Sequence, residues 1–431
     1  MPHILEDLKN FLDGSPTSYH AVSEIACRLA LCDFFPLEEK EPWNLERGKK
    51  YFVIREGALC AFILPISMPK KMVILGSHTD SPMLKLKPKA AYTVQNLRLL
   101  GVEIYGAPLL NAWLNRDLCL AGRVITTDMN ETMSSRLIYL DDAPVIIPQL
   151  AIHLDRDIDE KGLKLDKQEH VVPLAGLMKE EESVDNYLEK ELRRHIEFKK
   201  LLGFDLFLVP IEEARFLGNE GELIAASRLD NLVSVHAAVT AMGMVEHPAP
   251  DTLQMSIFWD HEEIGSRTLS GASSSFLKDT LKRIRLHLGM EKETYLQMKA
   301  DSFIVSIDAA QGFHPGFDKK YDLQHIPLLG KGIACKFNAG GKYATSGLSF
   351  AKVEQTLDAL GLDRQFYLGR NTITCGSTIG PLIETEMGIQ TLDIGIPILS
   401  MHSIREIAST KDHLDMCSLL QHLLQSKGQK V

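Results

Sequence analysis

The sequence lacks most features that mark secreted, membrane-bound or disulfide-stabilised proteins. Its seven cysteines are scattered and odd in number, without any Cys-x-x-Cys, which indicates reduced thiols rather than a disulfide framework or a thiolate zinc site. No run of ~18 apolar residues occurs, so we expect no membrane span. The first residues lack a basic segment followed by an apolar core, so we expect no secretory leader and a cytoplasmic protein.

Basic residues are in the minority, with 47 lysines and arginines against 57 aspartates and glutamates. The resulting formal net charge of -10 disfavours nucleic acid as a partner. Low-complexity tracts and internal repeats are also missing. At 431 residues and 45% hydrophobic, the chain is long and apolar enough to form the cores of two or three domains.

Apolar runs that stop abruptly at polar residues recur along the chain. They have the length and composition of strands at residues 51–54, 59–64, 72–75, 253–259 and 302–307, and of a strand followed by a turn at 391–400. Apolar residues at helical spacing predict helices within 4–32, interrupted at 13–17, and a further helix at 232–244. This mixture of strands and helices predicts an α/β fold.

The pattern of predicted elements changes between residues 85 and 217. Strand-like segments such as 92–97 and 123–126 are mixed there with prolines, short turns and a charged, helix-like run at 180–200. The pattern of a strand followed by a polar cluster resumes only after this region. We therefore interpret 87–218 as an insertion in the main domain.

Side chains capable of acid–base and metal chemistry follow several predicted strands. Glu262 and Glu263 lie just past the strand at 253–259, and two adjacent carboxylates near a strand end point in different directions. One of them can bind a metal ion while its neighbour acts as a general base for a bound water. A solvated acidic turn is the alternative interpretation of this pair.

His78 and Asp80 follow the strand at 72–75 as a His-x-Asp sequence. Such a pair can place the imidazole on a metal and the carboxylate on the other ring nitrogen, which fixes the tautomer and raises the basicity of the ligand. A polar turn with a surface histidine is the alternative. Asp230 opens a predicted helix, where the helix dipole favours a carboxylate whether it caps the helix or binds an ion.

Asp308 and His402 also lie just beyond predicted strands. The carboxyl ends of parallel strands gather at one edge of an open α/β sheet, so we expect these side chains to meet the ones above. Two histidines and several carboxylates, without cysteine, are the donor set of a hydrolytic two-zinc site, in which the ions lie ~3.5–4 Å apart.

A set of short motifs extends over the whole chain. They are the segments 11–22, 76–82, 227–232, 260–266, 375–381 and 401–406, together with Asp308. In sequence and in order, these motifs resemble the aspartyl aminopeptidase family of dizinc metallopeptidases. The resemblance implies an enzyme that removes N-terminal amino acids, acidic ones (Asp or Glu) among them, from peptides with a free N-terminus.

The resemblance also implies an architecture. Residues 1–86 and 219–431 would form a catalytic domain with a central mixed sheet flanked by helices. Residues 87–218 would form an inserted, β-rich dimerisation domain. Dimers would assemble further into a tetrahedral dodecamer, a homo-oligomer of this chain.

The resemblance assigns two Zn²⁺ ions to each subunit and gives their ligands. His78 and Asp308 would complete one zinc site. Glu263 and His402 would complete the other, and Asp230 would bridge the two ions. Cobalt or manganese would suit the same ligands.

Three residues would take part in catalysis on the same grounds. Glu262 would be the general base, Asp80 would orient His78, and His153 would reach into the active site of the neighbouring subunit. A zinc-bridging water, with its pKa lowered by the two cations, would attack the first peptide carbonyl after giving its proton to Glu262.

The substrate side chain would be bound by Lys336, Gln311 and Met401. Lys336 matches a position that can pair with an acidic side chain, whereas Gln311 stands where family members often carry a histidine. Some members of the family prefer neutral or apolar N-terminal residues. The alternative functions are another dizinc hydrolase, such as a carboxypeptidase or amidohydrolase, or a non-catalytic scaffold or cargo oligomer of the same fold.

Overall fold

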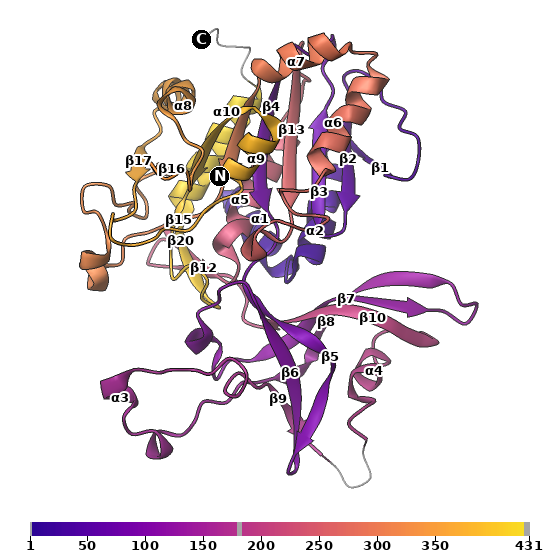
Figure 1. The fold of residues 1–431 in the computed structure, drawn as a ribbon, viewed down its shortest axis with the longest axis vertical. Coiled ribbons are helices and arrows are strands. Elements are labelled where there is room, and N and C mark those ends of the chain that lie inside the picture. Colours follow the sequence, from indigo (N-terminus) through magenta and orange to yellow (C-terminus); the bar gives the residue numbers. More distant parts are fainter. Residues whose placement is uncertain (1, 179–182, 426–431) are drawn as a thin grey trace. The chain divides into compact units, whose positions relative to one another are not determined.

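The computed structural model describes residues 2–178 and 183–425. By their contacts these residues form two compact units (Figure 1). Unit 1 lies within Met1–Asp80, Ala214–Met401 and Glu406–Val431, and unit 2 lies within Ser81–Glu213 and His402–Arg405. Unit 2 is thus built almost entirely from one continuous segment that interrupts unit 1 in sequence.

Unit 1 is built on a nine-stranded mixed sheet, which confirms the predicted α/β fold. In spatial order its strands are β1 (Phe34–Leu37), β2 (Lys50–Arg55), β3 (Ala58–Ile63), β13 (Thr252–Trp259), β4 (Lys71–His78), β14 (Phe303–Ile307), β18 (Gln390–Gly395), β16 (Ile333–Lys336) and β17 (Arg364–Tyr367). The strands β13, β4, β14 and β18 are parallel to one another, whereas β3 and β16 run antiparallel to their neighbours β13 and β18. The four parallel strands therefore end at the same edge of the sheet.

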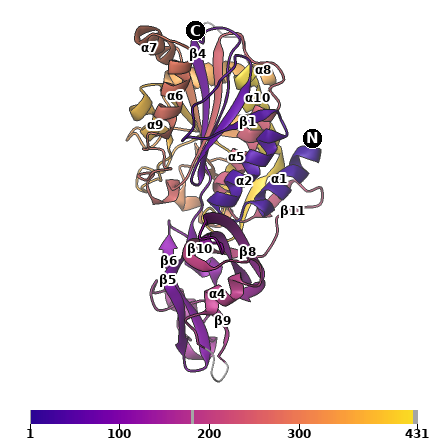
Figure 2. The ribbon, with the colours of Figure 1, turned by 90° about the vertical axis from the view of Figure 1, so that its right-hand side faces the viewer.

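Helices cover both faces of this sheet (Figure 2). One face carries α1 (Pro2–Gly14), α2 (Ser18–Ala30), α5 (Leu229–Gly243), α8 (Gly347–Leu360) and α10 (Thr410–Gln425). The other face carries α6 (Phe276–His287), α7 (Lys292–Ala300) and α9 (Gly380–Met387). Among the residues that the structure describes, no helix is both long and apolar enough to cross a membrane.

Alternate side chains of the central strands enter two separate cores. In β13, Ile257 and Trp259 pack on the side of α6, α7 and α9, while Phe258 packs on the side of α5 and α10. A strand that is buried on both faces needs a nearly continuous apolar sequence. This requirement explains why the run at 253–259 shows no polar–apolar alternation.

A smaller five-stranded sheet completes unit 1 and corrects one prediction. It consists of β11 (Arg215–Leu217), β12 (Leu223–Ala226), β20 (Glu406–Ser409), β19 (Pro397–Leu399) and β15 (Ala310–Gln311). The strand and turn predicted at 391–400 are corrected, because the run contains two strands, β18 and β19, which belong to different sheets. Pro397 begins β19, and a proline at the first residue of a strand removes a backbone donor where the new sheet starts.

Unit 2 is built on a six-stranded antiparallel sheet. Its strands, in spatial order, are β8 (Met133–Val145), β7 (Leu118–Thr127), β10 (Lys200–Pro210), β5 (Met83–Val94), β6 (Leu97–Tyr105) and β9 (Leu174–Leu177). Short helices lie between the strands: η1 (Leu110–Trp113), η2 (Ile152–Leu154), α3 (Ile158–Lys161) and α4 (Tyr187–Leu192). The dimerisation role expected for this segment stays a prediction.

Two local predictions for unit 2 are wrong. The strand expected at 92–97 is interrupted by a turn at residues 95–96 between β5 and β6, where Gln95 adopts a φ of 56°. A two-residue hairpin turn needs this left-handed backbone, which the strand-like composition of the segment conceals. The helix-like run at 180–200 contains only α4 before β10 begins, and residues 179–182 lie outside the described residues.

The contact between β14 and β18 limits the size of the residue at Gly395. A Cβ atom there would overlap the backbone oxygen of Asp308, the residue that follows β14. We therefore expect Gly395→Ala to lower the free energy of unfolding by about 3 kcal/mol, because backbone atoms cannot move aside as a flexible side chain can. Calorimetric thermal unfolding measures this change.

Gly347→Ala is the matched control, since a Cβ atom at the exposed start of α8 meets nothing within 4 Å. Its stability should stay within ~0.5 kcal/mol of the wild type. Equal effects of the two substitutions would contradict the packing argument.

Candidate active site

The C-terminal edge of the large sheet in unit 1 carries a group of polar side chains. The strand β4 ends at His78, and its parallel neighbour β13 ends at Trp259, which pairs with His78 in the register. Asp308 directly follows β14, on the other side of β4. Because these strands are parallel, the segments that follow them meet at this edge, as is usual for ligand sites in α/β sheets.

His78 contacts three aspartates and is almost completely buried. Its Nε2 lies 3.6 Å from Asp308 Oδ1 and 3.8 Å from Asp230 Oδ1. Its Nδ1 donates a hydrogen bond of 3.0 Å to the backbone oxygen of Asp80 and lies 3.4 Å from Asp80 Oδ1. One ring nitrogen is therefore held by Asp80, while the other faces the carboxylates of Asp230 and Asp308.

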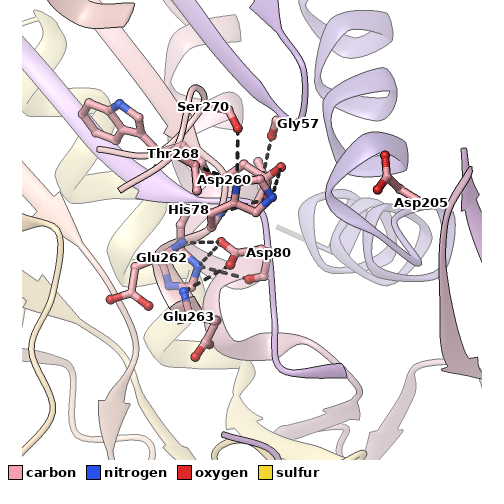
Figure 3. A network of polar contacts seen from close by, with 12 residues as sticks. Gly57, His78, Asp80, Asp205, Asp260, Glu262, Glu263, Thr268 and Ser270 are labelled. Atoms are coloured by element: carbon pink, nitrogen blue, oxygen red, sulfur yellow. Dashed lines mark hydrogen bonds and ion pairs between the residues drawn. The ribbon is translucent and has the colours of Figure 1, made fainter. Parts of the chain in front are cut away.

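Asp80 also holds the turn that carries the two glutamates (Figure 3). Its Oδ1 accepts a hydrogen bond of 3.0 Å from the backbone N–H of Glu262, and its Oδ2 accepts one of 3.1 Å from that of Glu263. These amides open η3 (Glu262–Ile264), where N–H groups lack partners within the helix. Sequence analysis missed this second contact of Asp80, because it joins segments far apart in the chain.

Asp260 and His261 stabilise the same turn through further hydrogen bonds, and Figure 3 shows Asp260 with its partner Ser270. Asp260 Oδ1 accepts a hydrogen bond of 2.9 Å from the backbone N–H of His261, and His261 Nδ1 lies 2.8 Å from Thr268 Oγ1. The backbone N–H of Asp260 donates to the carbonyl of Ser270 at 3.0 Å. His261 has a φ of 63°, a left-handed conformation that needs such support. Sequence analysis gave neither residue a role.

Asp230 is positioned by a buried glutamate that sequence analysis also missed. Its backbone N–H donates a hydrogen bond of 2.9 Å to Glu406 Oε2, and Glu406 is 2% exposed. The next side chain, Asn231, donates through Nδ2 to the backbone oxygen of Ile307 at 2.9 Å. The first bond ties the start of α5 to the beginning of β20, and the second ties it to the end of β14, next to Asp308. The only local signal was the position of Glu406 at the end of the last motif.

The titration of these groups reflects a concentration of negative charge. Burial lowers the pKa of His78, but hydrogen bonds to Asp308 and Asp80 raise it well above its usual range. For Asp308 the effects are reversed: burial raises its pKa, but the charges of Lys336 and His78 hold that pKa well below its usual range. Burial, with nearby carboxylates adding to it, raises the pKa of Glu262 to about 8. The surrounding carboxylates thus favour the protonated forms of His78 and Glu262.

The residues predicted to bind the substrate side chain have different surroundings. The Nζ atom of Lys336 lies 3.6 Å from Asp308 Oδ2 and 5.5 Å from the centre of the Tyr343 ring, and the lysine is buried. Gln311 is exposed, and its Oε1 accepts a hydrogen bond of 3.1 Å from Tyr367 Oη. Met401 packs against the hydrophobic core of unit 1. The two tyrosines were missed from the sequence.

Two further predicted site residues belong to unit 2 by their contacts. His402 has a φ of 65°, and its Nδ1 lies 3.1 Å from the backbone oxygen of Ala107. His153 lies in η2 and is exposed. The roles of His402 as a zinc ligand and of His153 in a neighbouring active site therefore stay predictions.

The donor set in unit 1 fits a divalent metal. Ligand atoms of His78, Asp230 and Asp308, and likewise those of His78, Glu262 and Glu263, lie within 4.8 Å of one another. Among the described residues of unit 1, the five carboxylates of Asp80, Asp230, Glu262, Glu263 and Asp308 gather around the basic groups of His78 and Lys336. Burying so many like charges is costly unless a cation compensates them, and nitrogen and carboxylate donors without sulfur suit Zn²⁺.

Comparisons with known proteins agree with this donor set. The sequence profile described as "Aminopeptidase I zinc metalloprotease (M18)" matches residues 11–423. A Streptomyces coelicolor protein named "Probable M18 family aminopeptidase 2" is 37% identical over 424 residues, which cover 97% of each chain. A Clostridium novyi protein of the same name is 35% identical and covers 94% of this chain and 95% of its own.

Solved structures show the same fold. A chain in the cryo-EM structure of the Ape4 and Nbr1 complex has a TM-score of 0.93 at 34% identity, covering 98% of this chain and 86% of that one. The structure of the S. cerevisiae mApe1 dodecamer has a TM-score of 0.84 at 27% identity, covering 98% and 97%. The relatives are named aminopeptidases, which selects this activity over the other hydrolases and the non-catalytic scaffold considered from the sequence. The chain therefore belongs to the M18 family of zinc metallo-aminopeptidases.

Proposed function

We propose that the chain uses two zinc ions, held at the C-terminal edge of the unit 1 sheet, to remove single amino acids from the N-terminus of peptides. The observation that carries this proposal is the convergence of His78, Asp230 and Asp308 beside a turn that presents two glutamates. His78 and Asp308 would hold one ion, Glu263 and His402 would hold the other, and Asp230 would be a ligand of both. Cobalt or manganese suits the same ligands.

Glu262 is the proton carrier in this proposal. Zinc bound by the neighbouring side chains would polarise the first peptide carbonyl and lower the pKa of water in the site. Glu262 accepts the proton of the attacking water and returns it to the leaving amine. Its place is fixed because Asp80 holds the turn on which it lies, which preserves the geometry needed for proton transfer.

Substitution of Glu262 tests this assignment. Glu262→Gln keeps the size of the side chain but removes the basic oxygen, so kcat should fall at least ~100-fold on peptides with a free N-terminus. The zinc content, measured by elemental mass spectrometry, should stay at the wild-type level because Glu262 is not a ligand.

Glu263→Gln is the matched control and should lose zinc. Loss of zinc in the Glu262 variant would mean that the two glutamates have exchanged roles. N-acetylated peptides should resist the wild-type enzyme, and their cleavage would argue against exopeptidase action.

We also propose that acidic N-terminal residues are among the substrates. The buried ammonium of Lys336 lies at the site edge and can form a charged hydrogen bond to a substrate carboxylate. Gln311, which stands in the place of a histidine, would offer a neutral hydrogen-bonding group, and Tyr367 donates a hydrogen bond to it. Neutral residues are therefore accepted as well.

Lys336→Met should weaken Asp and Glu substrates selectively. The expected loss in transition-state stabilisation is ~1.5–3 kcal/mol, the contribution of a charged hydrogen bond. Lys336 also faces Asp308, so its loss could disturb the metal site, and that disturbance would lower kcat/KM for all substrates by the same factor. The quantity to measure is therefore the ratio of kcat/KM between Glu- and Leu-naphthylamides. An unchanged ratio would show that Lys336 has no part in selectivity.

We further propose that dimers of the chain share active sites and assemble into a dodecamer. The segment around His153 carries exposed apolar side chains, with Leu150, Ile152 and Leu154 at 59%, 51% and 75% exposure. Three exposed apolar side chains within five residues are suited to burial in an interface with a second copy of the chain. A homologous structure, that of mApe1, is a dodecamer.

Mixed oligomers test whether His153 acts in the neighbouring subunit. His153→Ala and Glu262→Gln should each be nearly inactive. After subunit exchange in an equal mixture, about half of the dimers are mixed, and each mixed dimer has one intact site, so about a quarter of wild-type activity should return. If His153 acts within its own subunit, every site lacks one residue and no activity returns.

A further inference from the structure

A second group of potential metal ligands lies in unit 1 away from the sheet edge. It consists of His236 on α5 and of His413 and Cys417 on α10, all of them buried. The ligand atoms of these three side chains lie within 4.8 Å of one another. His236 Nδ1 is 3.0 Å from His413 Nε2, which is 3.5 Å from Cys417 Sγ.

The geometry of the two helices brings these donors together. His413 and Cys417 are four residues apart on α10 and therefore occupy the same face of the helix, one turn apart. The helix α5 packs against α10 and presents His236 to that face. Three donors thus converge from two rigid elements, which is how metal sites in helix bundles are built.

Asp7 on α1 prepares His236 for this role. Its Oδ2 accepts a hydrogen bond of 2.9 Å from Nε2 of His236, so the proton of the neutral ring is on that nitrogen. The lone pair of Nδ1 is then available on the side of His413, whose Nε2 is 3.0 Å away. A carboxylate on the outer nitrogen is the usual partner of a metal-binding histidine and raises its basicity. Arg28 holds Asp7 in turn, with Nη2 3.1 Å from Oδ1.

We propose that His236, His413 and Cys417 bind one thiophilic transition-metal ion of the zinc and monovalent copper class, separate from the catalytic ions. Binding displaces the thiol proton of Cys417 to solvent and the ring proton shared between the two histidines moves to Nδ1 of His413. Bonds of ~2.0–2.1 Å to nitrogen and ~2.3 Å to sulfur would separate the donors by about 3.3–3.8 Å, close to the observed distances.

The chemistry of the donors favours such an ion over the hard cations. A thiolate with two imidazoles selects zinc or copper, whereas magnesium and calcium require oxygen donors. Both imidazoles are buried between the helices, and the neutral ring is the form that binds a metal ion. Because the donors are enclosed between helices, the ion has a structural role and joins α5 to α10.

Cysteine gives this site a spectroscopic signature that the catalytic site lacks, since the proposed catalytic ligands contain no sulfur. The protein should be produced in cells grown with added cobalt, so that the ion enters during folding. The wild type should then show thiolate-to-cobalt charge-transfer absorption, and Cys417→Ser and His413→Gln should lose it. Elemental mass spectrometry should find about one more metal ion per chain in the wild type than in either variant.

Cys60→Ser is the matched control, because Cys60 is equally buried but lies on β3 and belongs to none of the donor groups among the described residues. This variant should keep both the absorption and the extra ion. Peptide hydrolysis by Cys417→Ser should remain, which shows that the variant is folded and that its catalytic ions are bound.

To identify the ion, the protein is produced without added metal and its metals are measured by elemental mass spectrometry. The additional ion per chain should then be either zinc or copper. Either result supports the proposal. A wild-type protein without charge-transfer absorption, or one whose absorption survives Cys417→Ser, would overturn it. The group would then be a buried hydrogen-bonded chain from Asp7 to Cys417. A failure of the catalytic proposal would leave this outcome unaffected, since the readout does not depend on activity.

Discussion

The carboxylate of Asp80 is the contact on which the geometry of the candidate site depends. It lies after β4, holds the ring of His78 near one of its oxygens, and accepts hydrogen bonds from the backbone of both Glu262 and Glu263. One buried carboxylate therefore fixes the imidazole at the end of β4 and the two glutamates that follow the neighbouring strand β13. Because three separate groups stabilise the same anion, displacement of any one of them would weaken the other two contacts.

Accumulated negative charge is the second constraint, and it links stability to metal binding. Carboxylates at the sheet edge keep the pKa of His78 raised and draw Lys336 to within 3.6 Å of Asp308. A divalent cation would relieve the same repulsion more effectively than a proton. If Lys336 also pairs with a substrate carboxylate, as proposed above, metal binding and selectivity for acidic residues would be coupled through this one side chain.

Unit 1 contains two groups of metal-type ligands whose positions suit different purposes. The group at the sheet edge lies where strands end and polypeptide turns begin, which allows a substrate to approach. The group formed by His236, His413 and Cys417 is enclosed between helices, so an ion there has protein on all sides. Its donors include sulfur, whereas the group at the edge has only nitrogen and oxygen, and this difference separates the metals that each would retain.

The elements of unit 1 could be predicted from the sequence because their signals are local. Uninterrupted apolar runs such as 253–259 mark strands buried on both faces, and the polar residues after them, including His78 and Asp308, mark the edge at which a site forms. The division of 391–400 between two sheets was not predicted, since hydrophobicity records that a strand is buried but not which sheet it joins.

The site residues that act through others were decided only by the tertiary structure. The hydrogen bond between Glu406 and Asp230 joins residues 176 positions apart, and the one between Asp80 and Glu262 joins residues 182 positions apart. No local pattern encodes such contacts. The pairing of His236 with His413 likewise depends on how α5 packs against α10. By itself the sequence determined the fold class and the residues with ligand chemistry, because periodicity and side-chain type are local. Folding decided which of those residues meet, because long-range contacts follow from packing.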